Sequence, residues 1–167
     1  MSLSMYDASV PVFVRVLRNL DQVLAKGEAH ARDKGADADI LLQSRLIFDM
    51  LPLVRQVQIA TDMATRGASR LAGVEPRSVE DNETTFAQLH ARIAAAIAHL
   101  EEFTPAQFEG SETRAVSFKT RAGELKFDGQ GYLLTYVLPN LYFHATTTYN
   151  LLRRNGVGIG KTDFLGG

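Results

Sequence analysis

The sequence contains no cysteine among its 167 residues and only four histidines. Without cysteine the protein can form no disulfide, use no thiolate nucleophile and hold no Cys-ligated zinc. For the same reason we expect a cytoplasmic protein. Any metal site must be built from carboxylates and the four histidines, which are His30, His90, His99 and His144.

An excess of one charge and a long apolar run are also missing. Lys and Arg number 18 and Asp and Glu number 19, which gives a net charge of -1. We therefore expect neither nucleic acid nor an anionic membrane surface as a partner. The longest apolar stretch, 132–143, is interrupted by Thr135, Pro139 and Asn140 and is unsuited to span a bilayer. Residues 1–6 lack the basic and apolar regions of a signal peptide.

Helical periodicity dominates the chain, which we interpret as one domain, 1–167. Hydrophobic residues make up 46% of the sequence, enough to bury a core. Apolar residues recur at steps of three and four, and this spacing predicts four long amphipathic helices, over 5–34, 39–71, 83–103 and 130–155. Pro11 lies inside the first and Pro52 inside the second, and we expect each proline to bend its helix.

The segments between these helices carry their own signals. Either Asp81 or Asn82 is expected to cap the third helix, and Thr104 followed by proline predicts a single capped turn. Over 115–128 apolar residues alternate with polar ones around a glycine-containing turn, which predicts a β-hairpin lying against the helices. Beyond the fourth helix, 156–167 is expected to be a glycine-rich tail.

The predicted fold class is all-α: a four-helix bundle with a small β-hairpin between helices three and four. The connection 73–82 is long enough to cross the end of the bundle, so helices two and three can run parallel. The first helix carries a second apolar strip at Val12 and Val16, more than one core face requires. We interpret this strip as a subunit contact and expect a homodimer.

The string 155–162, NGVGIGKT, nearly matches a phosphate-binding loop. That loop needs a strand before it and a helix after it, so that helix amides face the phosphates. Here a predicted helix precedes the string, Asn155 replaces the first glycine, and the sequence continues for only five residues beyond Thr162. We interpret the string as a helix C-cap and tail.

His144 is the ionisable residue of greatest interest, because it shares the apolar stripe of the fourth helix with Val137, Leu141 and Leu151. An inward imidazole needs a polar partner, a water or a metal. One interpretation is a core histidine hydrogen-bonded to a neighbouring helix, and the other is a ligand or metal site.

The other histidines have weaker patterns. His99 shares a polar face with Gln88 and Arg92 and is expected to be solvated, whereas His90 flanks an apolar stripe and is expected to be half-buried. His30 falls in the polar end of the first helix. No two histidines stand at the spacing that helical metal motifs use.

Arg55, Gln58 and Asp62 share one face of the second helix. Turned inward, they would supply a cation, an amide and a carboxylate to the cavity that receives His144. Turned outward, Asp62 would pair with Arg66 four residues later. The spacing leaves both arrangements open.

Four strings resemble the bacterial family DUF1993 over nearly the whole chain: SMYDASVPVFVRVLRNL (4–20), RQVQIATDMA (55–64), RLAGVE (70–75) and PNLYFHATTTYNLLRRNGVGIGKTDFLG (139–166). The last string is the most specific. The resemblance implies a DinB/YfiT-like bundle with its helices in up-down-down-up order.

The same resemblance implies a metal site and thiol-dependent chemistry, because relatives in the superfamily hold a metal with one histidine on helix two and an H-x-x-x-H pair on helix four. Only His144 matches that pattern, since Thr148 stands four residues later. Helix two offers Gln56, Gln58 or Asp62 but no histidine. One ligand of three makes an incomplete zinc site.

Two hypotheses follow. In the first, the protein is a small-molecule-binding or structural dimer with a degenerate metal site, its ligand held by Arg55, Gln58, Asp62, His144 and Thr148. In the second, it is an enzyme in which His144 is a base, or one ligand of a weakly held Zn or Ni ion. No catalytic residue beyond the candidate His144 can be assigned, and we expect no tightly bound metal. A cavity lined jointly by His144, Asp62 and Arg55 would favour the enzyme, and an Asp62–Arg66 salt bridge in solvent would favour the binding protein.

Overall fold

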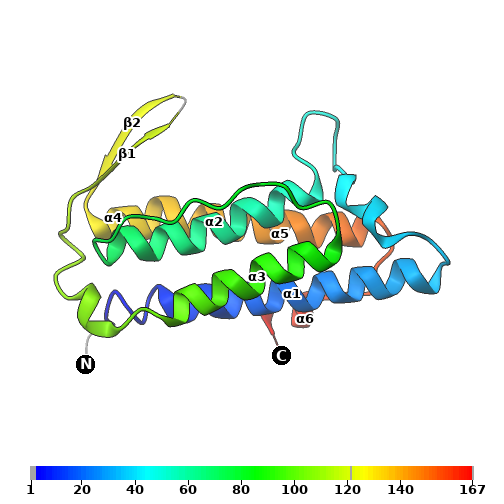
Figure 1. Cartoon of the computed structure of the whole chain (residues 1–167), viewed down its shortest axis with the longest axis horizontal. Coiled ribbons are helices and arrows are strands. Elements are labelled where there is room, and N and C mark those ends of the chain that lie inside the picture. The colour runs from blue at the N-terminus through cyan, green and yellow to red at the C-terminus, as the bar shows by residue number, and fades with distance from the viewer. Residues whose placement is uncertain (1–2, 121, 167) are drawn as a thin grey trace.

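The computed structural model describes residues 3–120 and 122–166, and its long helices form a bundle (Figure 1). The four long helices are α1 (Val10–Asp33), α2 (Leu53–Leu71), α3 (Phe86–Glu101) and α5 (Leu138–Arg154). The helices α2 and α3 run parallel to each other and opposite to α1, and α5 returns in the direction of α1 (Figure 1). Each of α1 and α2 packs against both α3 and α5. This up-down-down-up order confirms the predicted all-α bundle.

The core is built from the predicted apolar stripes. Every long helix contributes side chains that are fully buried, and they include Phe13, Leu17, Leu24, Val57, Leu71, Leu89, Ile93, Leu141 and Leu151. Because the stripes recur every three or four residues, each helix presents one continuous apolar face to the others. Burial of these faces supplies most of the bundle's stability.

The two expected proline bends are wrong, because both prolines lie at helix starts. Pro11 is in the first turn of α1, where its missing N–H would have no helical acceptor in any case. Pro52 directly precedes α2, and residues 44–52 form a loop. The predicted continuous helix over 39–71 is therefore split into the 3₁₀ turn η1 (Ala38–Gln43), this loop and α2.

The helix α3 begins at Phe86, three residues later than predicted, because Thr85 rather than Asp81 or Asn82 is its cap. The amide N–H of Gln88 donates to Thr85 Oγ1 at 3.2 Å, and Gln88 Oε1 accepts from the Thr85 amide at 3.1 Å.

Between α2 and α3 the chain is extended along the length of the bundle (Figure 1). We call residues 74–85 the crossover segment. After α3, the predicted capped turn is η2 (Pro105–Phe108).

The predicted hairpin is present as β1 (Val116–Thr120) and β2 (Gly123–Phe127), with Phe118 opposite Leu125 in antiparallel register. Position 121 of its turn lies outside the described residues. The rings of Phe118 and Phe127 pack on Tyr132 and Tyr136 of the following helix. The hairpin is thus held to the bundle at its base and projects beyond it (Figure 1).

The predicted fourth helix consists of three consecutive pieces. They are α4 (Gly129–Tyr132), the π-helical segment η3 (Leu133–Val137) and α5. The wider π turn directly precedes Pro139, which has no N–H to donate to the carbonyl of Thr135. The predicted tail contains a further short helix, α6 (Lys161–Leu165), which packs on α1 through Asn19 Nδ2 donating to the Phe164 carbonyl at 3.1 Å.

Candidate functional site

His144 is half-buried on α5 and hydrogen-bonds to Gln56 of α2. Its Nδ1 lies 2.7 Å from Gln56 Oε1, while Gln56 Nε2 donates to the carbonyl of Leu51 at 2.9 Å. Because the amide nitrogen is committed to Leu51, Oε1 must accept, so the proton of the imidazole sits on Nδ1. Burial lowers the pKa of His144 and keeps the ring neutral at pH 7. This geometry matches the interpretation of a core histidine bonded to a neighbouring helix.

The surroundings of His144 do not fit the three-ligand metal site that the resemblance implies. Nδ1 is used by Gln56, which leaves only Nε2. Thr148 is fully buried and its hydroxyl donates to the carbonyl of His144 at 3.0 Å. Over 3–120 and 122–166, no three His, Asp or Glu side chains converge closely enough to hold an ion.

The other predicted site residues are turned toward α3 and the crossover segment. Gln58 is buried and donates from Nε2 to Glu83 Oε2 at 2.6 Å, and its Oε1 accepts from Arg55 Nη1 at 2.7 Å. Asp62 pairs with Arg66 at 2.9 Å, but its side chain is only 16% exposed, so the pair is not the surface contact of the outward arrangement. In the described part of the chain, none of Arg55, Gln58 and Asp62 shares a hydrogen bond or ion pair with His144.

The centre of this second arrangement is Arg92 of α3, whose side chain is only 4% exposed. The guanidinium has five N–H groups, and five acceptors surround it. Nε donates to Thr61 Oγ1 at 2.8 Å, Nη2 to Asp62 at 2.8 Å, and Nη1 to Glu83 and the Glu80 carbonyl, each at 3.0 Å. Nη2 also forms an ion pair with Asp81 at 3.0 Å. Arg92 therefore fastens the crossover segment to α2 and α3.

Charges in this network balance. Three carboxylates (Asp62, Asp81 and Glu83) face three guanidiniums (Arg55, Arg66 and Arg92). Burial raises the pKa of Asp62 in spite of its two arginine partners. Burial alone would also raise the pKa of Glu83, but the hydrogen bonds from Gln58 and Arg92 outweigh it and lower that pKa.

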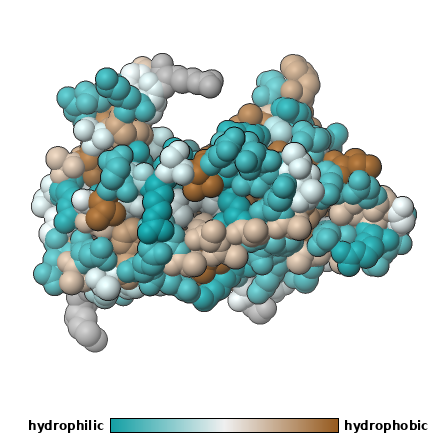
Figure 2. All heavy atoms as spheres, in the orientation of Figure 1, coloured by the Kyte–Doolittle hydropathy of each residue, from teal (hydrophilic) through white to brown (hydrophobic). Residues whose placement is uncertain are grey.

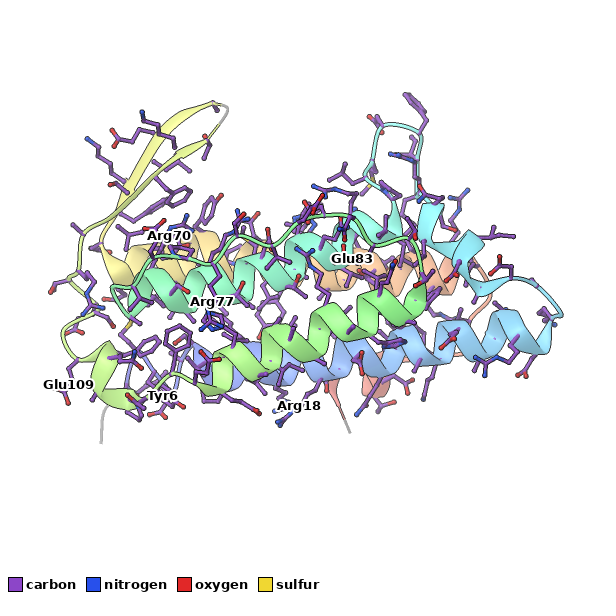
Figure 3. The ribbon with its side chains drawn as sticks, viewed as in Figure 1. Tyr6, Arg18, Arg70, Arg77, Glu83 and Glu109 are labelled. Carbon is purple, nitrogen blue, oxygen red and sulfur yellow. The ribbon has the colours of Figure 1, made fainter. Side chains whose placement is uncertain are left out.

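Beside the network, the crossover segment, α2 and α3 line an open pocket of about 430 Å³. Figure 3 shows Arg77 and Glu83 at the two ends of the stretch of crossover segment that borders it. Small residues of α3 leave the space: Ala91, Ala95 and Ala96 line it, opposite Val79 of the crossover segment. This volume lies within the range of about 300–1,000 Å³ that is usual for small-molecule sites.

His99 also lines this pocket, and the expectation that it is solvated is wrong. Its side chain is 13% exposed, and Nε2 is buried with no hydrogen-bond partner within the described residues. The face of α3 that carries it is polar in the sequence but is covered by the crossover segment. His90, by contrast, is half-buried as expected, with Nδ1 2.6 Å from Asp21.

The face that carries the pocket is mainly hydrophilic, with small, separate hydrophobic patches (Figure 2). Within the described residues, no helix is both long enough and apolar enough to cross a membrane.

Comparison with known proteins settles the family. The family model described as a domain of unknown function, DUF1993, matches residues 5–165. The chain belongs to DUF1993. The DUF1993 chain is also similar to a DinB family member from Shewanella denitrificans of known crystal structure, with 42% identity and a TM-score of 0.92. The similarity covers 98% of this chain and 92% of the other. No curated protein matches the chain significantly.

Proposed function

We propose that this bundle binds a small molecule in the α2–α3 pocket. The observation that carries the proposal is the pocket itself, because most of its accessible surface is apolar and the buried Nε2 of His99, a lining residue, has no partner within the described residues. Pockets of this kind, mostly apolar with a few polar groups, are the usual sites for small ligands.

The polar groups around the pocket favour binding over catalysis. Asp62, Glu83 and Arg92 are already paired with one another. The Thr65 hydroxyl donates to the Thr61 carbonyl at 3.0 Å, so no adjacent base activates it as a nucleophile.

Indole is a suitable probe, because it is small, apolar and carries one N–H. Isothermal titration calorimetry with indole is expected to show binding to the unaltered protein and none to Ala95→Phe, whose ring fills the pocket. The control is Ala98→Phe, which adds the same ring at an exposed position of α3 outside the pocket. Equal binding to all three proteins would contradict the proposal.

A second candidate function is base catalysis by His144, favoured by the fixed position of its proton. With Nδ1–H bonded to Gln56, Nε2 holds a free electron pair in the neutral ring. Acylation by diethylpyrocarbonate followed by mass spectrometry tests this reactivity. Faster modification of His144 than of His30 supports the candidate, and protection of His144 argues against it.

Homodimerisation through α1 is a separate proposal. Val12 and Val16 line a hollow of about 260 Å³ whose other walls include Tyr142 and Leu165. These last two side chains are 41% and 48% exposed, so apolar surface continues beyond the strip. Light scattering is expected to give twice the mass of the chain, and a Val12→Lys variant is expected to give a monomer. A monomeric mass for the unaltered protein would refute the proposal.

A further inference from the structure

His99 is linked through Glu102 to Arg77. Its Nδ1 lies 3.3 Å from Glu102 Oε2, and the same carboxylate oxygen accepts from Arg77 Nη2 at 2.8 Å. In the neutral imidazole Nδ1 carries the proton, because a carboxylate only accepts. Nε2 of this tautomer is an acceptor that is buried and has no donor within the described residues, and His99 lines the α2–α3 pocket.

A buried acceptor that loses water without gaining a donor costs free energy, and such groups are rare in folded proteins. Two neighbouring side chains, Phe103 and Arg77, do not supply the donor. The ring of Phe103 packs against His99 with centroids 5.2 Å apart, and the Arg77 guanidinium is turned to Glu102. A water molecule or a ligand in the pocket can supply the N–H or O–H for Nε2.

Charge pairing limits what such a ligand can be. Asp62 and Glu83 line the pocket together with Arg92, and these three are matched within the network. At the other end, Arg77 is matched by Glu102. A charged ligand would therefore lose its hydration without gaining a free counter-charge from the residues that line the pocket.

We propose that the α2–α3 pocket selects a neutral, largely apolar molecule that carries an N–H or O–H group, and that this group donates to Nε2 of His99. This inference rests on the proposed function and adds the class of ligand to it. Ala91, Ala95, Ala96 and Val79 surround the apolar body, and Glu102 holds the imidazole in the tautomer that accepts.

Indole and benzofuran form the matched pair that tests the selection, because benzofuran has the same ring shape with an oxygen in place of the N–H. Both are titrated into the full chain by calorimetry. Indole is expected to bind roughly 3- to 10-fold more tightly, the range of one net hydrogen bond. In His99→Phe the preference is expected to disappear, while Ala95→Phe is expected to abolish binding of both compounds.

A second measurement uses the unaltered protein, so it does not depend on whether a variant folds. The ¹⁵N resonance of His99 Nε2 in the unaltered protein is expected to shift on addition of indole and to stay in place with benzofuran. Equal affinities and no Nε2 shift, with binding still lost in Ala95→Phe, would overturn the selection by His99 and leave the pocket's function intact. No binding of either compound would overturn the proposed function and the inference with it.

Discussion

Arg92 Nη2 of α3 lies 2.8 Å from Asp62 Oδ1 of α2 and joins two parallel helices at a buried point. The same guanidinium holds Asp81 and Glu83, so the crossover segment is fixed over the groove between these helices. The held position of the crossover segment creates the pocket, because this segment forms the outer wall of the pocket. The stability of the network and the function of the pocket are therefore linked.

Removal of the Arg92 charge is expected to destabilise the protein strongly. In Arg92→Met the half-buried carboxylates of Asp62 and Glu83 and the exposed carboxylate of Asp81 lose a shared partner, which is expected to lower the free energy of unfolding by about 3–5 kcal/mol. Urea denaturation measures the change. Arg18→Met is the control, since Arg18 is 60% exposed in its pair with Glu101 and is expected to cost at most about 1 kcal/mol. Similar losses in both variants would show that the network is dispensable.

Gly129 is expected to tolerate no side chain. A Cβ there would lie 1.8 Å from the carbonyl oxygen of Ser111, which as backbone cannot easily move aside. We expect Gly129→Ala to lower the free energy of unfolding by about 1–3 kcal/mol or more. At Gly158 a Cβ meets nothing within 4 Å, so Gly158→Ala is expected to be within about 0.5 kcal/mol of the unaltered protein. Denaturant midpoints that coincide for the two variants would contradict this expectation.

His144 is expected to make stability depend on pH. Burial lowers its pKa in the folded state, so as pH falls the unfolded chain takes up a proton first. The contribution of neutral His144 is thus complete above the ordinary value of 6.5 and is lost as pH falls through the lower folded pKa. Unfolding free energies measured from pH 7.5 down to 4.5 are expected to fall more steeply for the unaltered protein than for His144→Gln. Parallel curves would show that His144 is not desolvated.

Metal content is expected to be low. His144 offers Nε2 alone, and Thr148 donates its hydroxyl to a backbone carbonyl, so fewer than three ligands are available at this place. Protein purified without chelator is expected to carry substoichiometric metal by elemental analysis. About one zinc or nickel per chain, lost in His144→Ala, would contradict the expectation.

Much of the fold follows from the sequence because the apolar stripes are long and regular. Phe13, Leu17 and Leu24 show how three- and four-residue steps predict a buried face. The length of the connection 73–82 correctly allowed parallel helices. The predicted bends at the prolines were wrong because apolar residues can keep the helical spacing across a loop. The periodicity then does not reveal where a helix begins. Pro52 starts a helix rather than bending one, a choice that depends on tertiary packing.

The candidate site was only partly predictable from the sequence. The spacing of residues along a helix shows which of them share a face, but it does not show which other element packs on that face. Arg55, Gln58 and Asp62 do share a face, but α3 and the crossover segment lie over it instead of His144. Arg92 and His99 were assigned to a solvated surface for the same reason. The available signal was the group of acids in the crossover segment, at Glu80, Asp81 and Glu83.

Amide chemical-shift mapping with indole tests the central claim most directly, because it reports on all parts of the molecule at once. Two-dimensional ¹H–¹⁵N spectra of the full chain are recorded as indole is added. The largest shifts are expected at the pocket lining, including Thr65, Val79, Ala95, Ala96 and His99. Shifts centred on His144, or on the α1–α6 hollow at Val16, or an unchanged spectrum, would contradict ligand binding in the α2–α3 pocket.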